Sequence, residues 1–206
     1  MLLVIGNKNY SSWSLRPWIA MKVLGIGFDE MRIPLYQPGS KERILGYSQA
    51  GKVPILRDGD TVVWDSLAIL EYLAERHPNL WPADRAQRAK ARSISAEMHS
   101  GFAKLREHMS MNTRKRYPGK GRTPEVLADI ARIDAIWSEA KGPFLFGAFS
   151  AADAMYAPVV LRFRTYDVQV RKQSYMDAML ALPAMREWVE AAEREAESIP
   201  DQDLYG

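Results

Sequence analysis

The chain has 206 residues, of which 47% are hydrophobic and 26% charged, and its formal net charge is +3. This is the composition of a folded globular protein, with enough residues for two modest domains. Basic and acidic residues are interleaved in most segments, so the small positive charge predicts no nucleic-acid partner. The chain has no cysteine, which excludes disulfides, thiolate metal ligands and a thiol nucleophile of the protein itself. Any sulfur nucleophile must therefore come from a ligand.

The first predicted element is a buried strand over residues 2–5, an apolar run that is too short for a signal peptide or a membrane span. We therefore expect a cytoplasmic protein with no membrane partner. Serines then open an apolar helical pattern that Gly25 ends. Ser14 as N-cap would put Pro17 at the third helical position, where no backbone donor is needed, whereas Ser12 as N-cap would lose one hydrogen bond.

The next elements complete a small α/β unit. Residues 28–34 predict a second strand, and residues 41–45 predict a short helical segment. Two β-rich runs, residues 53–56 and 61–64, flank an Asp-Gly turn and predict a hairpin. Apolar residues at helical spacing follow over 67–77. The order βαβ followed by ββα indicates an α/β domain with a mixed sheet.

The remainder of the chain is predicted to be all-helical. Pro78 and Pro82 mark a linker at about residues 78–86. This linker divides a domain over residues 1–79 from one over residues 86–206. Strand signals disappear after the linker, and helical periodicity covers residues 84–112, 123–141, 151–166 and 183–197. Ser150 and Asp153 form a capping box at the start of the third of these segments.

Val53-Pro54 lies at the head of a strand that is expected to pair in the centre of the sheet, where proline supplies no N–H to the ladder. A cis bond there would leave the backbone of Val53 free to pair with an extended peptide ligand. The alternative is an ordinary edge-strand proline.

Two predicted helix N-termini supply positions for anions. A helix N-terminus presents unpaired N–H groups and a partial positive charge, so the serines before the first helix suit an anion. At the helix over 67–77, Ser66 suits a carboxylate and Asp65 suits an ammonium group, which together match an α-amino acid head. Plain helix capping explains the same residues equally well.

The other candidate residues carry less chemistry. His77, His99 and His108 have neither metal-ligand spacing nor a paired acid, so no metal site is predicted. An apolar stripe over residues 94–109 favours a core over a pocket, although methionine and phenylalanine also line adaptable apolar sites. The stripe consists of Ile94, Met98, Phe102, Leu105 and Met109.

These pieces, taken in order, resemble the cytosolic glutathione transferase family over nearly the whole chain. Residues 48–56 and 64–73 look like the glutathione-site signature of that family, and residues 150–158 look like its C-terminal capping motif. The resemblance implies a thioredoxin-like N-terminal domain, an all-helical C-terminal domain, glutathione as co-substrate and a homodimer.

The resemblance also implies roles for individual residues. Val53, beside a cis Pro54, would pair with the cysteinyl backbone of glutathione, and Asp65 with Ser66 would hold the γ-glutamyl head. Lys52 and Lys41 would meet the glycine carboxylate.

The stretch from Ser11 to Arg16 looks like the active-site segment of the serine-type, zeta-like classes. The resemblance places the thiol-facing hydroxyl at Ser11, with Ser12 as second choice and Tyr10 as a rival if the site works in the tyrosine manner. Zeta-class isomerases carry a cysteine where this chain has Trp13, which argues against maleylacetoacetate isomerisation. Because the chain has no cysteine, thiol transfer in the omega or beta manner is also disfavoured.

The predicted activity is attack of a glutathione thiolate on a small hydrophobic electrophile docked between the domains. The expected pocket residues are Trp13, Met98, Phe102 and Arg106. A glutathione-dependent peroxidase, dehalogenase or isomerase would use the same thiolate. A non-catalytic interaction or stress module with this fold is the alternative from another class, and it would bind glutathione weakly or without turnover.

Overall fold

Four short strands near the N-terminus form one mixed sheet in the computed structural model, which describes residues 1–206. The strand order is β2-β1-β3-β4. Strand β1 (Leu2–Ile5) pairs in parallel with β2 (Asp29–Arg32) and antiparallel with β3 (Ile55–Asp58). Strands β3 and β4 (Thr61–Trp64) form the predicted hairpin, whose turn contains Gly59 at φ 59°.

Alternation along the strands separates two apolar cores, because successive side chains of a strand point to opposite faces. Leu3 and Leu56, which pair across β1 and β3, belong to the large core of the molecule. Val4 and Ile55, also paired, join a small cluster with Ile44 on the opposite face.

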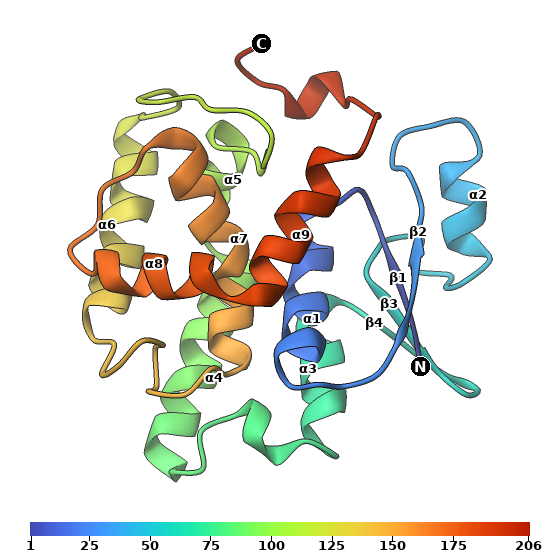
Figure 1. The fold of residues 1–206 in the computed structure, drawn as a ribbon, viewed down its shortest axis with the longest axis horizontal. Helices are drawn as coiled ribbons and strands as arrows, with labels where there is room; N and C mark the ends of the chain where they lie inside the picture. Colours follow the sequence, from blue (N-terminus) through green and yellow to red (C-terminus); the bar gives the residue numbers. More distant parts are fainter.

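Helices cover both faces of the sheet (Figure 1). Helices α1 (Ser12–Val23) and α3 (Ser66–Ala74) lie between the sheet and the helical half of the molecule. The short helix α2 (Ser40–Leu45) covers the other face through Ile44. The N-terminal ends of α1 and α3 are the helix ends that the sequence singled out as sites for anions.

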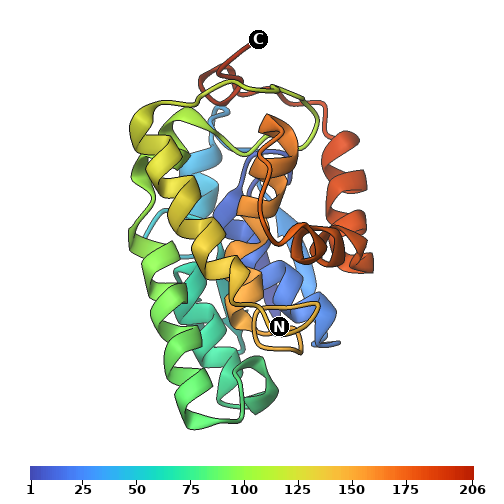
Figure 2. The same cartoon turned by 90° about the vertical axis from the view of Figure 1, so that its left-hand side faces the viewer.

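The rest of the chain is helical, and none of its helices is long and apolar enough to cross a bilayer. Helix α7 is almost entirely buried and packs against both α1 and α4. Helices α4 and α6 run beside each other (Figure 2) and are joined by the ion pair Glu97–Arg132 at 2.6 Å. The helices are α4 (Arg85–Ser100), α5 (Ala103–His108), α6 (Pro124–Ser138), α7 (Ala151–Tyr166), α8 (Gln173–Ala181) and α9 (Pro183–Glu193), with 3-10 turns η1 (Pro78–Leu80) and η2 (Pro200–Gln202).

Three helical expectations need correction. The segment 84–112 is not one helix, because α4 ends at Ser100 with Gly101 as its C-cap, and Phe102 takes a left-handed conformation with φ 58° before α5 begins. A Cβ at position 101 would lie 2.8 Å from the Glu97 carbonyl oxygen, so glycine is needed at that turn. Helix α8 was not predicted, and the segment expected to be helical over 183–197 ends at Glu193, where the C-terminal tail begins.

The predicted capping box at the start of α7 is confirmed. The fully buried Asp153 carboxylate accepts the Ser150 N–H at 2.8 Å and the Ser150 hydroxyl at 2.9 Å. It also accepts the Leu145 N–H at 2.9 Å, which ties the preceding loop to the helix.

Candidate functional site

Two adjoining cavities of about 590 Å³ and about 550 Å³ lie where the N-termini of α1 and α3 face the helical half of the chain. Trp13, Lys52 and Val53 line both of them. The first cavity also contains Asp65, Ser66 and His99, and the second contains Ser11, Ser12, Lys41, Arg106 and Arg162. Pro54 lines the first cavity as well. Ten of the twelve residues predicted for the site thus line these two adjoining cavities.

Ser11, and neither Ser14 nor Ser12, is the N-cap of α1. The Asn7 carbonyl accepts the N–H of Ser11 at 2.7 Å, which turns the chain early and lets the helix start at Ser12. Pro17 therefore lies inside the helix and leaves one helical hydrogen bond unmade. No side chain caps this helix, so the Ser11 hydroxyl is not consumed by capping.

The Ser11 hydroxyl belongs to a short chain of hydrogen bonds. Its oxygen lies 2.7 Å from the Ser14 hydroxyl, which accepts the Gly6 N–H at 3.1 Å. If Ser14 donates to Ser11, then the Ser11 proton is free for a ligand, and each bond in the chain polarises the next. The Ser12 hydroxyl lies at the second cavity and is not part of this chain of hydrogen bonds.

The Tyr10 hydroxyl is engaged elsewhere. It donates to the Asp203 carboxylate, whose oxygens lie at 3.0 and 3.1 Å, and it accepts from Arg114 at 3.0 Å. A hydroxyl whose proton is held by a carboxylate is a poor donor to a ligand, so the geometry favours the serines over Tyr10.

The Val53-Pro54 peptide bond is cis, as expected. The backbone N–H and C=O of Val53 make no hydrogen bond within the chain and lie where the two cavities meet. Beside it, Lys41 donates to the Gly51 carbonyl at 3.0 Å, while the exposed Lys52 is unpaired. An extended peptide with a carboxylate end fits these donors and acceptors.

Asp65 has a left-handed backbone with φ 76°, and it is the N-cap of α3. One carboxylate oxygen accepts the Leu67 N–H at 2.8 Å, and the other lies 3.4 Å from Nε2 of His99. The Ser66 hydroxyl accepts from Arg16 at 3.2 Å. Positive φ is strained for a residue other than glycine, and here it occurs at a residue that lines the first cavity.

His99 is a site residue that the sequence did not reveal, because its acid partner lies on a different helix. Its Nδ1 is buried without a hydrogen-bond partner, and its ring meets the Trp13 ring edge-on at 5.3 Å. No group of three or more potential metal ligands forms around it or elsewhere in the chain.

Three arginines surround the Trp13 side chain and the second cavity. The guanidinium of Arg16 lies 4.2 Å from the Trp13 ring centroid, and that of Arg106 lies 5.3 Å from it. Burial and the neighbouring arginines lower the pKa of Arg16 to about 9 and that of Arg162 to about 10, while burial lowers the pKa of Arg106. All three stay cationic at neutral pH, so the region attracts anions.

Arg162 is the member of this cluster whose two terminal nitrogens both lack a partner. Its only hydrogen bond runs from Nε to the Met109 carbonyl at 2.8 Å, although its side chain is almost fully buried. The two terminal nitrogens have no partner in the chain, and the residue lines the second cavity. A buried guanidinium with free donors is suited to a carboxylate.

Met98 and Phe102, expected in the substrate pocket, line neither cavity. Both are buried in the large core together with the rest of the apolar stripe, as the structural interpretation of that stripe predicts. Met98 contributes only its carbonyl oxygen, which accepts from Arg106 at 2.6 Å. Of the four expected pocket residues, Trp13 and Arg106 line the second cavity.

The chain matches known proteins along most of its length. The family model for the N-terminal domain of glutathione S-transferase matches residues 10–76, and that for the C-terminal domain matches residues 63–191. A maleylacetoacetate isomerase of Rattus norvegicus is 28% identical over 190 residues, which cover 85% of this chain and 87% of that protein.

Two further likenesses agree with this. A probable maleylacetoacetate isomerase of Caenorhabditis elegans is 36% identical over 97 residues, which span 46% of this chain and 45% of that relative. The crystal structure of a maleylacetoacetate isomerase from Methylobacterium extorquens AM1, with bound malonate and glutathione, superposes with a TM-score of 0.70 at 21% identity. That superposition covers 97% of this chain and all of the other, and it shows a common fold.

Proposed function

Because this chain belongs to the glutathione S-transferase family, we propose that it binds glutathione across both cavities and activates the thiol with the Ser11 hydroxyl. The unpaired backbone of Val53 carries the proposal, since it lies between Asp65 at one cavity and Ser11 at the other. The γ-glutamyl head occupies the first cavity, and the cysteinyl backbone pairs with Val53. Lys52 and Lys41, which line the second cavity, would meet the glycine carboxylate.

A modest interaction energy is sufficient for this activation. A thiol with a pKa of about 8.5 is only about 3% ionised at pH 7, and lowering its pKa by about two units requires about 2.7 kcal/mol. A hydroxyl hydrogen bond to the sulfur, together with the positive end of a helix, supplies energy of this order. The N–H groups of Trp13 and Ser14 donate to no acceptor within the chain and add to the positive end of α1.

The electrophile that fits the second cavity carries a carboxylate. The sequence predicted a small hydrophobic electrophile, but the free donors of Arg162 and the charge of Arg106 favour an anionic one. The structure of the Methylobacterium extorquens protein contains bound malonate as well as glutathione, which supports an anionic ligand. The thiolate forms a bond to an electrophilic carbon of this acid. In a substitution the leaving group departs with its bonding pair, and in a conjugate addition to a carbon–carbon double bond the resulting carbanion takes up a proton from water. Expulsion of the thiolate after bond rotation would instead complete an isomerisation and return glutathione unchanged.

Ethacrynic acid and its methyl ester test this substrate class, because both carry the same α,β-unsaturated ketone and differ only in charge. We expect the kcat/KM of the acid to exceed that of the ester by about tenfold, as one charge-assisted hydrogen bond predicts. In Arg162→Gln, which keeps a donor but loses the charge, the two values should converge. Steady-state kinetics with both compounds measures this, and an ester preference in the wild-type protein would contradict it.

The γ-glutamyl subsite has its own test in Asp65→Asn. Asparagine caps a helix about as well as aspartate, so α3 should keep its N-cap and the thermal midpoint should change little. The loss of charge opposite the ammonium group should weaken glutathione binding by tenfold or more. Calorimetric titration with glutathione measures the dissociation constant, and unchanged affinity would place the γ-glutamyl head elsewhere.

Assembly and the rival function are tested by the same preparation. We propose a homodimer, as the family resemblance implies, and sedimentation equilibrium gives the mass directly.

The rival function is a non-catalytic interaction module with this fold. It would be favoured if the wild-type protein bound no glutathione at millimolar concentration.

A further inference from the structure

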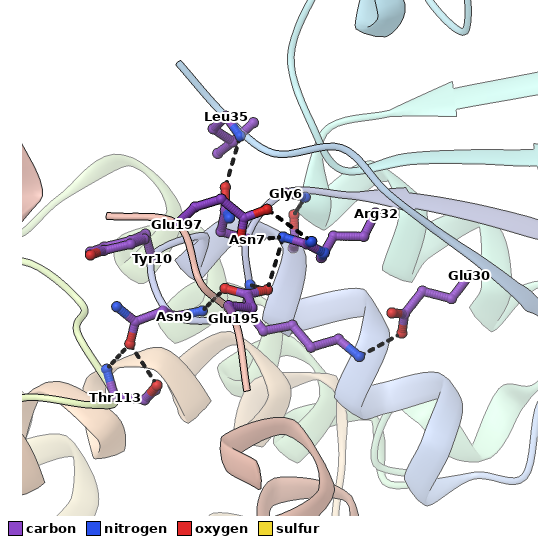
Figure 3. A network of polar contacts seen from close by, with 12 residues as sticks. Gly6, Asn7, Asn9, Tyr10, Glu30, Arg32, Leu35, Thr113, Glu195 and Glu197 are labelled. Carbon is purple, nitrogen blue, oxygen red and sulfur yellow. Dashed lines mark hydrogen bonds and ion pairs between the residues drawn. The ribbon is translucent and has the colours of Figure 1, made fainter. Parts of the chain in front are cut away.

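The C-terminal tail, residues 194–206, returns to the loop that carries Ser11 (Figure 3). The carboxylate of Glu195 accepts the N–H of Lys8 at 2.7 Å and the N–H of Asn9 at 3.1 Å. On the other side of the loop, the Trp188 indole N–H of α9 donates to the Lys8 carbonyl at 2.9 Å. The last helix and the tail thus hold the backbone just before Ser11, in addition to the bonds within its own domain.

Glu195 is well placed to hold this backbone. Its side chain is only 4% exposed, and its nearest counter-charge is Arg32 at 3.6 Å. Burial raises the pKa of the Glu195 carboxyl, whereas the two N–H donors and Arg32 favour its ionised form. Charge-assisted bonds to buried backbone N–H groups are stronger than neutral ones.

Two asparagine side chains of the loop, on either side of Lys8, also bond to neighbouring segments. Asn7 accepts the Leu35 N–H at 2.7 Å, and Asn9 accepts the N–H and hydroxyl of Thr113, both at 2.8 Å (Figure 3). These bonds use side chains of the loop. Glu195 is the only residue whose side chain accepts the backbone N–H groups of two consecutive loop residues, and neither group has another acceptor.

We propose that Glu195 is a positioning residue for thiol activation, which sets the place of the Ser11 hydroxyl by holding the backbone of Lys8 and Asn9. The inference rests on the proposed function. Hydrogen bonding to a sulfur depends steeply on distance and angle, and a displacement of about 1 Å in a site can cost about 100-fold in rate. The C-terminal tail thereby determines how strongly the N-terminal serine stabilises the thiolate.

Glu195→Gln tests this role, and Glu197→Gln is the matched control. Glutamine can accept one of the two N–H groups, but its own NH₂ would face the other. Glu197 lies on the same tail and makes two bonds to Arg32, at 3.0 and 3.1 Å, yet none to the loop. We expect Glu195→Gln to raise the thiol pKa of bound glutathione by about one unit and to lower kcat about fivefold at pH 6.5. The glutathione dissociation constant should stay within about twofold of wild type, and Glu197→Gln should change neither the thiol pKa nor kcat.

Trp188→Phe keeps the ring packing while removing the N–H bond to Lys8, and it should shift the thiol pKa in the same direction. All variants are measured well below their thermal midpoints. An unchanged thiol pKa and kcat in Glu195→Gln, with a Ser11→Ala effect intact, overturn the positioning role alone. A wild-type thiol pKa that is not depressed overturns the proposed function, and the positioning role with it.

Discussion

Replacing Ser11 by alanine is expected to lower kcat/KM by about 10- to 50-fold at pH 6.5, because bound glutathione loses the hydroxyl that stabilises its thiolate. The loss should shrink as the pH rises and should be small above pH 9, where the thiol ionises without help. The pH profile of kcat/KM with an excess of glutathione measures both effects. A uniform loss at every pH would indicate a damaged binding site instead of a lost activator.

Ser12→Ala is the control for this experiment. Ser12 lines the same cavity and is nearly as buried as Ser11, but it is not joined to the Ser14 and Gly6 hydrogen-bond chain. We expect its pH profile to match that of the wild type within about threefold. If Ser12→Ala shows the shifted profile and Ser11→Ala does not, then the second choice from the sequence is the thiol-facing serine.

The second large effect is on stability. Asp153→Ala is expected to reduce the free energy of unfolding by about 3 kcal/mol or more, because it leaves the buried N–H groups of Ser150 and Leu145 without an acceptor. Urea denaturation followed by far-UV circular dichroism at a fixed protein concentration measures the change.

Ser150→Ala provides the comparison for that effect. It removes the capping hydroxyl but keeps the carboxylate and both of its N–H bonds, so a loss of about 1 kcal/mol is expected. Equal losses in the two variants would mean that the hydroxyl, and not the buried carboxylate, dominates this capping box.

Elements that depend on local pattern could be predicted from the sequence. The Asp-Gly turn, the strand over residues 2–5 and the capping box at Ser150 follow from neighbouring residues, and all three are present. The cis bond at Val53-Pro54 and the residues around it were also found, since a proline at the head of a central strand is unusual.

Features that join distant segments could not be predicted. Asp65 and His99 belong to different helices, and Glu195 meets Lys8 across nearly the whole chain. Arg162 lies within an apolar helix, and its free donors emerge only when α7 is packed beside the second cavity. No spacing in the sequence indicates such contacts.

The prediction of the N-cap of α1 was wrong for a related reason. Capping statistics favour a serine whose hydroxyl bonds the helix, and Ser14 also accommodates Pro17. In the structure, tertiary bonds around Asn7 fix the loop, and the helix starts earlier despite its internal proline. Because the Ser11 side chain does not cap the helix, its hydroxyl remains available to a ligand.

The most direct test of the central claim is the thiolate absorbance of glutathione bound to the wild-type protein, followed as a function of pH. The claim predicts a midpoint at about pH 6.5, two units below that of a free thiol. A midpoint that stays near pH 8.5 would show that the protein binds glutathione without activating it, and that result would contradict the claim.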